Sequence, residues 1–592
     1  MSTSNSSPSS SRSTPTPLRG NPQNGNWIIQ KYGGTSVGKF LNTIADEIVP
    51  KYLNDNHRVA LVCSARSGST KATGTTNLLL RAALEALRPK APDMASSFSS
   101  FRNSPLATPA PGTPSTSNSS SGGRPGLHNS ISSLRLADRL NEQEKNLFDE
   151  TVDQIKRDHL EAARKVIKTE EVLREVEDEL EYDCERLRGF LKAAQIIEEI
   201  STRSKDIIMG VGERLSCRIV AAALRDRGID SELVSLESII DWEVVSADDP
   251  KTGDGAPQLG QDFYSKLSQR LGERLLECGD RVPVVTGFFG VVPGSLLAQV
   301  GRGYSDLCAA LCAVGTSASE LQVWKEVDGI FTADPRKVPT ARLLATITPE
   351  EAAELTYYGS EVIHPFTMEQ VIRNSIPIRI KNVENPKGEG TIIFPDHVTS
   401  DASRPPSPPR NARVATAPSA APSLPHDVEV PEHHLGPTAI TIKDTVLVLS
   451  IRSNRKTISH GFFARIFGTL DKHGIVVDLI STSEVHVSMA IYGEVRKGVL
   501  DRVVRDLKVV GEVSISKDMA ILSLVGKHMK NMVGTAGKMF STLAEGNINI
   551  EMISQGASEI NISCVIEEKD AVKALNLVHL RLLHQAQQPN FS

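Results

Sequence analysis

The sequence lacks the features that would assign it to several broad classes of protein. No apolar run approaches the roughly 20 residues that a helix needs to cross a bilayer, so we expect no membrane partner. The formal net charge is −5 and basic residues are not clustered, which argues against nucleic-acid binding. The seven cysteines are scattered, without Cys-x-x-Cys pairs or histidines at zinc spacing. This argues against a disulfide framework and favours a reducing compartment, so we expect a cytoplasmic protein.

Three nucleotide-binding signatures are also missing. The chain has no Gly-x4-Gly-Lys-Ser/Thr motif, which excludes a P-loop enzyme. It has no His-Arg-Asp and Asp-Phe-Gly set, which argues against a protein kinase. No Gly-x-Gly-x-x-Gly follows a predicted strand in the tail, so a fused NAD-dependent dehydrogenase is not supported.

Low-complexity stretches rich in Ser, Pro, Gly and Asn interrupt the chain. Such compositions bury too little apolar surface to offset the entropy of ordering. We interpret 1–26 as a disordered N-terminal tail, about 91–133 as a disordered surface insertion, and 396–439 as a Pro-rich linker. Because the tail lacks acidic residues and contains Arg12 and Arg19, an organellar transit peptide is the alternative interpretation of that segment.

The first part of the chain, 27–395, has the pattern of an α/β domain. Residues 58–63 and 282–286 are almost entirely apolar, as expected for strands buried on both faces of a parallel sheet. They alternate with helical segments such as 305–314, which predicts a sandwich around a largely parallel sheet. Residues 135–205 are highly charged with apolar residues at helical spacing, which predicts long helices with no chemistry of their own.

The tail contains an internal repeat with a period of about 73 residues. Each unit predicts a strand, a loop, a helix, a glycine and two further strands, an α/β module used twice at 440–512 and 513–592. The shift superimposes residues of the same character: Leu449 on Leu522, Phe467 on Phe540, Ile475 on Ile548, Asp478 on Glu551 and Ser481 on Ser554.

Two segments in the first domain suggest anion and amine binding. Lys-Tyr-Gly-Gly-Thr-Ser-Val at 31–37 ends a strand at a lysine, and its glycines let backbone N–H groups approach a phosphate. An ordinary turn is the alternative. Gly-Glu-Arg-Leu-Ser at 212–216 places a carboxylate where it could bind an amine or cap a helix.

Two later segments carry further charged groups on turns. Thr-Gly-Phe-Phe-Gly at 286–290 is followed by Gly-Arg-Gly-Tyr-Ser-Asp at 301–306, which leads into an Ala-rich helix whose N-terminus favours an anion. The segment 324–336 ends in Asp-Pro-Arg, which suits a phosphate contact. A capped Gly-rich turn and an Asx-Pro turn are the respective alternatives.

Together, in this order, these segments resemble the aspartate kinase family, a branch of the amino-acid kinase fold. Val-Ile-His-Pro at 362–365 is a fifth matching segment, and the tail resembles the paired ferredoxin-like ACT domains of that family. The resemblance covers 27 to about 90, about 135–395 and 440–585, and the Ser/Pro insertions look most like fungal members. It implies a three-layer α/β kinase domain at 27–395 followed by two ACT domains.

The resemblance also implies roles for individual residues. Lys31 would stabilise charge on the transferred phosphoryl group, and Asp306 would orient Lys31 and the reacting groups. ATP would be the co-substrate, with Mg²⁺ held mostly by ATP oxygens and water rather than by a protein cage. The residues implied to bind aspartate are Ser64, Thr76, Glu213 (its ammonium group), Arg302 (its α-carboxylate) and Ser305. The residues implied to bind the nucleotide are Lys31, Gly33, Gly34, Ser36, Asp328, Phe331 and Arg336.

The sequence departs from the family pattern at several positions. Tyr304 replaces the fourth glycine of the usual Gly-Arg-Gly-Gly-Ser-Asp, which is expected to narrow the pocket. Lys325 and Glu326 replace the Thr-Asp that often follows the tryptophan, and Glu361 replaces a nucleotide-binding lysine. The adenine contacts are therefore not carried over.

In the tail, the resemblance implies an amino-acid effector site. The residues implied to contact the effector are Gly461, Asp478 and Ser483 in the first module and Asn547, Gln555 and Asn561 in the second. Asp478 would bind the effector's ammonium group. Fungal-type members favour threonine over lysine as the inhibitor, and pairing of ACT modules between chains implies a homo-oligomer.

Two other functions remain open at this point. The chain could be another amino-acid kinase, acting on glutamate or acetylglutamate, although the segments at 212–216 and 301–306 and the two ACT modules disfavour this. It could also be a catalytically inactive amino-acid sensor, although Lys31 and Asp306 are both present.

Overall fold

The computed structural model describes residues 18–68, 74–88, 146–241, 244, 259–292, 295, 303–357, 363–394, 436–453, 461–493, 495–557 and 560–584. The segment interpreted as a disordered insertion, 91–133, lies outside these residues, as does most of each of the segments 1–26 and 396–439. Arg302 and Glu361 also lie outside them. The boundaries assigned to the domains from the sequence stay predictions.

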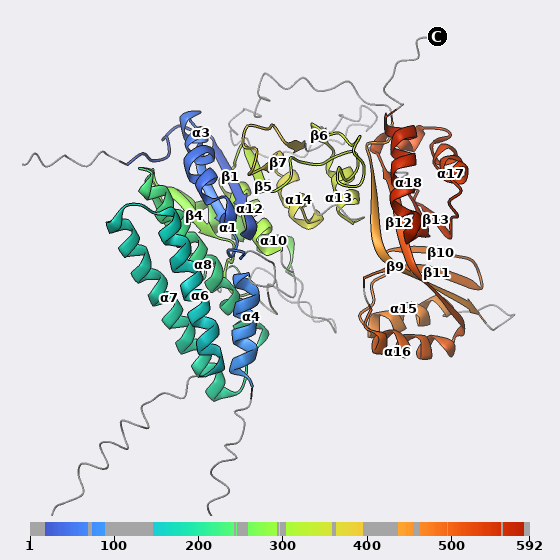
Figure 1. Ribbon diagram of the computed structural model, residues 1–592, viewed down its shortest axis with the longest axis horizontal. Helices are drawn as coiled ribbons and strands as arrows, with labels where there is room; N and C mark the ends of the chain where they lie inside the picture. The colour runs from blue at the N-terminus through green and yellow to red at the C-terminus, as the bar shows by residue number, and fades with distance from the viewer. Residues whose placement is uncertain are drawn as a thin grey trace, which may run out of the picture.

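The first part of the chain folds around an eight-stranded sheet of order β3-β4-β2-β1-β5-β7-β8-β6 (Figure 1). All neighbouring strands pair in parallel except β7 and β8. The predicted apolar runs form its central strands and are buried on both faces. The strands are β1 (Trp27–Tyr32), β2 (Arg58–Cys63), β3 (Ser231–Val234), β4 (Val282–Thr286), β5 (Glu320–Lys325), β6 (Thr346–Ile347), β7 (Ile378–Asn382) and β8 (Thr391–Ile393).

Helices cover both faces of this sheet, each over its own hydrophobic core. This three-layer α/β arrangement confirms the predicted fold class. One face carries α1 (Gly34–Lys39), α2 (Leu41–Thr43), α3 (Val49–Asn54), α4 (Thr75–Ala86), α6 (Leu147–Val166), α7 (Glu170–Ile197) and α8 (Thr202–Asp226). The other carries α10 (Gln261–Leu276), α12 (Tyr304–Gly315), α13 (Pro349–Tyr357) and α14 (Pro365–Ile372).

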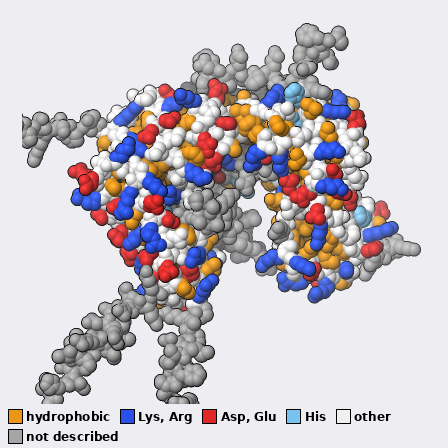
Figure 2. Space-filling view, viewed as in Figure 1, with side chains coloured by type: hydrophobic (Ala, Val, Ile, Leu, Met, Phe, Trp, Pro, Cys, Tyr) orange, Lys and Arg blue, Asp and Glu red, His pale blue; other side chains and the backbone are white. Residues whose placement is uncertain are grey.

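The long helices predicted in 135–205 are α6 and α7, which pack as a hairpin beside α8 (Figure 1). A capping box between Asn146 and Asp149 begins α6. Arg188 on α7 ties the hairpin together through ion pairs of 2.6 Å to Asp149 and 2.7 Å to Asp153. Figure 2 shows acidic and basic side chains interspersed over this helical layer.

The described residues of the tail form a six-stranded sheet of order β10-β11-β9-β12-β14-β13 with four α-helices. The sheet is antiparallel throughout its described pairs. The strands are β9 (Ala439–Ser453), β10 (Leu479–Thr482), β11 (His486–Tyr492), β12 (Gly511–Val525), β13 (Met552–Gln555) and β14 (Asn561–Glu567). The helices are α15 (Phe462–Lys472), α16 (Lys497–Lys508), α17 (Thr535–Glu545) and α18 (Ala571–Val578).

Strand pairing resolves the tail into two ferredoxin-like modules that share their two longest strands. Residues 446–452 of β9 pair with β11, while residues 439–443 pair with the second half of β12. That second half also pairs with β14. Each module therefore takes its fourth strand from one half of β9 or β12, so the two modules form one folding unit.

Three hydrophobic cores stabilise the tail. One lies under α15 and α16, another under α17 and α18. The third joins the modules, because Leu479 of β10 and Ala490 of β11 pack in one cluster with Met552 of β13 and Val565 of β14. The sheet therefore buries apolar residues on both faces, with the helix pairs at its two ends (Figure 1).

The two parts of the molecule contact each other through polar groups. The imidazole of His579, which is fully buried, lies 2.9 Å from the Thr332 hydroxyl and 3.3 Å from the Thr340 hydroxyl. Glu351 of α13 accepts hydrogen bonds from the Thr438 hydroxyl and the Lys527 N–H group at 2.6 and 2.7 Å. The segment after β5 is thus docked on the tail. Among the described residues, no helix combines the length and the apolar composition needed to cross a membrane.

Close packing of α10 against α12 gives a stability prediction. A Cβ on Gly272 would lie 2.2 Å from the Gly315 carbonyl oxygen, so Gly272→Ala must push the helices apart. We expect the substitution to cost about 1–3 kcal/mol and to lower the thermal unfolding midpoint by several degrees, measured by circular dichroism. The matched control is Gly189→Ala on α7, where the new methyl group meets open space and is expected to be neutral or slightly stabilising. Equal effects of the two substitutions would contradict the packing argument.

Candidate active site

The charged centre of the site lies where β1 ends and α12 begins. Lys31 is the fifth residue of β1, and its ammonium nitrogen lies 2.7 Å from Oδ1 of Asp306 in the first turn of α12. The two side chains are 10% and 19% exposed, so water screens their attraction only partly. The free N–H groups of the α12 N-terminus lie in the same region and favour an anion there.

Two serine hydroxyls lie beside this pair. Ser64 follows β2 directly, and its Oγ is 2.8 Å from Oγ of Ser305 on α12. Gly287, which follows β4, allows α12 to come this close, because a Cβ there would lie 2.5 Å from the Ser305 Cβ. The carboxyl ends of β1, β2 and β4 therefore converge on the start of one helix, as parallel pairing of these strands requires.

A buried carboxylate forms another wall of the site. Glu213 lies in the middle of α8 and not, as the sequence had predicted, at the start of a helix, because α8 already begins at Thr202. It is 2% exposed and accepts hydrogen bonds from the N–H groups of Gly287 and Phe288. The Tyr304 hydroxyl bonds to the same carboxylate. Burial raises the pKa of Glu213 to about 8, against the lowering effects of these hydrogen bonds and of Lys31. A cation placed beside this carboxylate would stabilise its ionised form, which burial otherwise disfavours.

The predicted phosphate-binding turn is formed by the residues after β1. Gly34 is required sterically, since a Cβ there would lie 2.2 Å from the Ala65 carbonyl oxygen, whereas Gly33 faces open space. Ser36 is buried, and its hydroxyl donates to Glu326 at 2.8 Å. The structure thus joins Ser36 to the segment after β5 that was predicted to bind nucleotide, and its phosphate contact stays a prediction.

The remaining predicted nucleotide residues lie on the segment after β5. Asp328 accepts hydrogen bonds from the side-chain amides of Asn382 at 3.0 Å and Asn385 at 3.4 Å. Phe331 forms an isolated bridge with Leu343. Arg336 is 88% exposed and pairs with Asp334 at 3.0 Å. These contacts are with the segment itself and with the end of β7, so they leave the nucleotide assignments as predictions.

The predicted aspartate residue Thr76 is the second residue of α4 and is half-buried. Its neighbour Thr75 is the one that packs against α8, because a Cβ on Gly212 would lie 3.0 Å from the Thr75 Cγ2. The sequence prediction missed Gly287, Phe288 and Tyr304 as partners of Glu213. The Thr-Gly-Phe-Phe-Gly motif was a signal for the first two.

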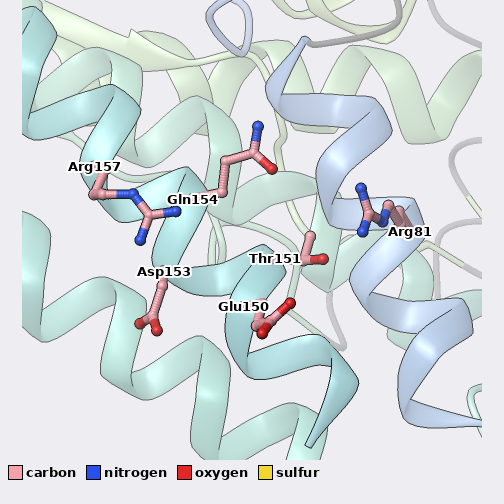
Figure 3. Close-up of a pocket in the computed structure, with 6 residues that line it drawn as sticks. All are labelled: Arg81, Glu150, Thr151, Asp153, Gln154 and Arg157. Carbon is pink, nitrogen blue, oxygen red and sulfur yellow. The ribbon is translucent and has the colours of Figure 1, made fainter.

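A surface pocket lies elsewhere, between α4 and α6 (Figure 3). None of the predicted site residues lines it. The side chains of Arg81 and Thr151 are both bound to Glu85, each at 2.7 Å. The residues that line this pocket are Arg81, Glu150, Thr151, Asp153, Gln154 and Arg157.

Comparison with known proteins identifies the family. Residues 26–382 match the amino acid kinase family, and residues 522–582 match the ACT domain. The chain is 49% identical to the aspartokinase of Schizosaccharomyces pombe, over 96% of this chain and 94% of that protein. It is 46% identical to the Saccharomyces cerevisiae aspartokinase, over 95% and 93% of the two chains.

The chain belongs to the aspartokinases. Its fold matches that of Escherichia coli aspartokinase III in complex with lysine and aspartate, with a TM-score of 0.63, 23% identity and coverage of 94% and 99% of the two chains. The resemblance drawn from the sequence motifs is thereby confirmed, as is the aspartate kinase class of enzyme.

In this aspartokinase, the predicted effector residues of the first ACT module lie at the ends of α15 and β10. Gly461 is the N-cap residue of α15 and has a φ of 78°. Glycine adopts this left-handed conformation without the steric cost that other residues incur. The Asp478 carboxylate lies 2.5 Å from the Lys443 ammonium group and accepts a hydrogen bond from the Tyr492 N–H group at 2.8 Å. Ser483 donates its N–H to the His486 carbonyl in the turn between β10 and β11.

The three predicted effector residues of the second module lie in different surroundings. Asn547 has a φ of 51° in the turn after α17, and Gln555 ends β13 with an exposed side chain. The side-chain amide of Asn561 donates to Glu354 of α13. Asn561 therefore lies at the contact with the kinase domain, and the effector roles of all three stay predictions.

The raised pKa of Glu213 gives a prediction about stability. A carboxyl group that folding makes harder to ionise favours the folded state at low pH. Its contribution is complete below the usual pKa of 4.5 and is lost as pH rises toward about 8. We therefore expect the free energy of unfolding of the ligand-free protein to fall over this range, by up to about 1.4 kcal/mol per pH unit.

Glu213→Gln is expected to flatten that part of the pH dependence, measured by urea unfolding between pH 5 and 8. Glu150→Gln, on the exposed rim of α6, is the matched control and should follow the wild type. A Glu213→Gln variant whose stability falls with pH as steeply as the wild type would contradict the assignment.

Proposed function

We propose that the enzyme transfers the γ-phosphoryl group of ATP to the side-chain carboxylate of L-aspartate. The product would be 4-phospho-L-aspartate, at the start of the route through homoserine to threonine, methionine and isoleucine. The observation that carries this proposal is the Lys31–Asp306 pair at the N-terminus of α12, beside the Glu213 carboxylate. The related Escherichia coli aspartokinase III is known in complex with aspartate and ADP, which supports the choice of ligands.

The chemistry needs positioning and electrostatics. A side-chain oxygen of aspartate attacks the γ-phosphorus, and the bond from that phosphorus to the oxygen bridging to the β-phosphate breaks, so ADP leaves with the charge. Lys31 and the α12 N–H groups stabilise negative charge on the transferring group, while Asp306 fixes the lysine. Ser64 and Ser305 offer hydroxyls to the substrate carboxylate.

The ammonium group of aspartate is assigned to Glu213. Two backbone N–H groups and the Tyr304 hydroxyl fix the position of the Glu213 carboxylate. A carboxylate fixed in this way can form a charge-assisted hydrogen bond with an ammonium group. Arg302 is proposed to bind the α-carboxylate, and Gly33, Gly34 and Ser36 the phosphates. Asp328, Phe331 and Arg336 are proposed for the rest of the nucleotide, and Thr76 for the wall of the aspartate pocket.

Magnesium is proposed to enter with ATP. The described residues contain no group of three or more His, Cys, Asp or Glu side chains that could hold a metal ion. This fits an ion held by phosphate oxygens and water, with the protein contributing few ligands. When bound, the ion would neutralise charge on the phosphates.

The regulatory tail is proposed to bind threonine in preference to lysine, and to pair with a second copy of the chain. The positions of Gly461, Asp478 and Ser483 around α15 and β10 support a small amino-acid site. The Escherichia coli enzyme is known with lysine, which keeps lysine as the alternative effector. All seven cysteines are free and buried, which supports the reducing environment of the cytoplasm.

The test of the activity is an ATP-dependent hydroxamate assay with aspartate, glutamate or acetylglutamate as acceptor. We expect product with aspartate, and a loss of roughly a thousandfold or more in Lys31→Ala because the developing charge loses its main cation. The control is Lys192→Ala on the exposed side of α7, which should retain activity. A preference for glutamate or acetylglutamate, or full activity of Lys31→Ala, would refute the proposal.

The test of regulation adds threonine or lysine to the same assay. We expect threonine to inhibit, and Asp478→Ala to raise the inhibitory concentration by about 5- to 150-fold, as a coupling of a few kcal/mol implies. The exposed Asp501→Ala on α16 is the matched control. Inhibition by lysine alone would make the effector assignment wrong, and unchanged inhibition of Asp478→Ala would exclude that residue.

A further inference from the structure

Tyr304 is a residue of the site to which no role has been assigned. It is the first residue of α12, its side chain is buried, and its ring packs edge-on against Phe288 with the ring centroids 6.5 Å apart. Its hydroxyl bonds to the Glu213 carboxylate. The ring therefore packs against a residue whose N–H group bonds to Glu213, and the hydroxyl of the same tyrosine bonds to the carboxylate itself.

The backbone around Tyr304 leaves it little freedom. Ser305, the next residue, is packed against Gly287 so closely that no Cβ fits between them. The same turn after β4 provides the Gly287 and Phe288 N–H groups that bond to Glu213. Three donors from two elements thus converge on one carboxylate of a third element, α8.

The phenol is a donor in this arrangement. Burial, followed by the nearby Glu213 carboxylate, keeps the pKa of Tyr304 well above its usual value of 10, so the hydroxyl keeps its proton. The hydrogen bond from Tyr304 favours the ionised form of Glu213, while burial of Glu213 opposes that form. Without the phenol, the balance would move further toward the neutral carboxyl group, which binds an ammonium ion poorly.

Other groups near the Glu213 carboxylate also affect its ionisation. Lys31 reaches it from β1 and favours its ionised form. The thiols of Cys217 on α8 and Cys308 on α12 lie near enough to interact with it, but burial raises the pKa of both, so both stay neutral. The Asp206 carboxylate of α8 also contributes to the raised pKa of Tyr304. None of these neighbours replaces the hydrogen bond from the phenol.

We propose that Tyr304 is a positioning residue for recognition of the substrate's amino group, and that the hydrogen bond from its hydroxyl holds the Glu213 carboxylate in the orientation that meets the bound ammonium. The proposal rests on the proposed binding of aspartate by Glu213. It gives a chemical role to a tyrosine at a position where the family more often has glycine.

The test compares wild type with Tyr304→Phe, which keeps the ring and removes the hydroxyl. We expect the Kd for aspartate, measured by calorimetry, and its KM to rise about 10- to 100-fold, the range typical of a lost hydrogen bond to a charged group. The KM for ATP and kcat at saturating aspartate should change less than about twofold. The acid limb of the kcat/KM profile for aspartate should move to higher pH, because Glu213 loses a bond to its ionised form.

Succinate provides the readout that separates positioning from shape, because it has the two carboxylates of aspartate without the amine. We expect Tyr304→Phe to leave the Kd for succinate within about twofold of wild type. Equal weakening of aspartate and succinate, or unchanged aspartate binding, would overturn the proposal. Tyr52→Phe, which removes a buried hydroxyl on the opposite face of the sheet, should behave as wild type.

The same measurements distinguish this proposal from the function on which it rests. If wild type fails to bind aspartate, or Glu213→Gln binds it as well as wild type does, the assignment of Glu213 is wrong and the role of Tyr304 falls with it. If Glu213→Gln weakens aspartate binding and Tyr304→Phe does not, only the role of Tyr304 is wrong.

Discussion

The ion pair between Lys31 and Asp306 is the interaction on which the site depends. It joins the central strand β1 to the first turn of α12, so the lysine is held beside the helix N-terminus rather than free to swing into solvent. Both partners are largely removed from water, which strengthens their attraction to each other and to a nearby phosphate. Ser64 and Ser305 lie beside this pair at the start of α12.

The site separates two kinds of charge. The lysine and the helix N-terminus attract anionic groups, whereas Glu213 provides one buried carboxylate for a cation. Keeping these charges apart requires rigid spacing, which the glycine at position 287 makes possible by letting α12 lie directly against the turn after β4. A substrate with a carboxylate to phosphorylate and an ammonium group to anchor is complementary to this division.

Much of the site could be predicted from the sequence, because Lys31 and Ser64 lie at the ends of apolar strands that pair in parallel. Parallel strands bring their carboxyl ends to one edge, so short motifs there meet in space. The contacts of Tyr304 with Glu213 and of Ser36 with Glu326 could not be predicted, since they depend on side-chain packing between distant segments. The two modules share β9 and β12, and this could not be predicted either. It depends on the register in which these two strands pair, which the sequence repeat does not specify.

The regulatory tail meets the kinase domain at the segment that follows β5, through His579, Thr332 and Thr340. The arrangement of charges in the site is tested most directly by a crystal structure with aspartate and a non-hydrolysable ATP analogue. We expect the γ-phosphate beside Lys31 and the aspartate ammonium within hydrogen-bond distance of Glu213. A complex with the ammonium group elsewhere, or with the phosphates away from Lys31, would contradict this arrangement.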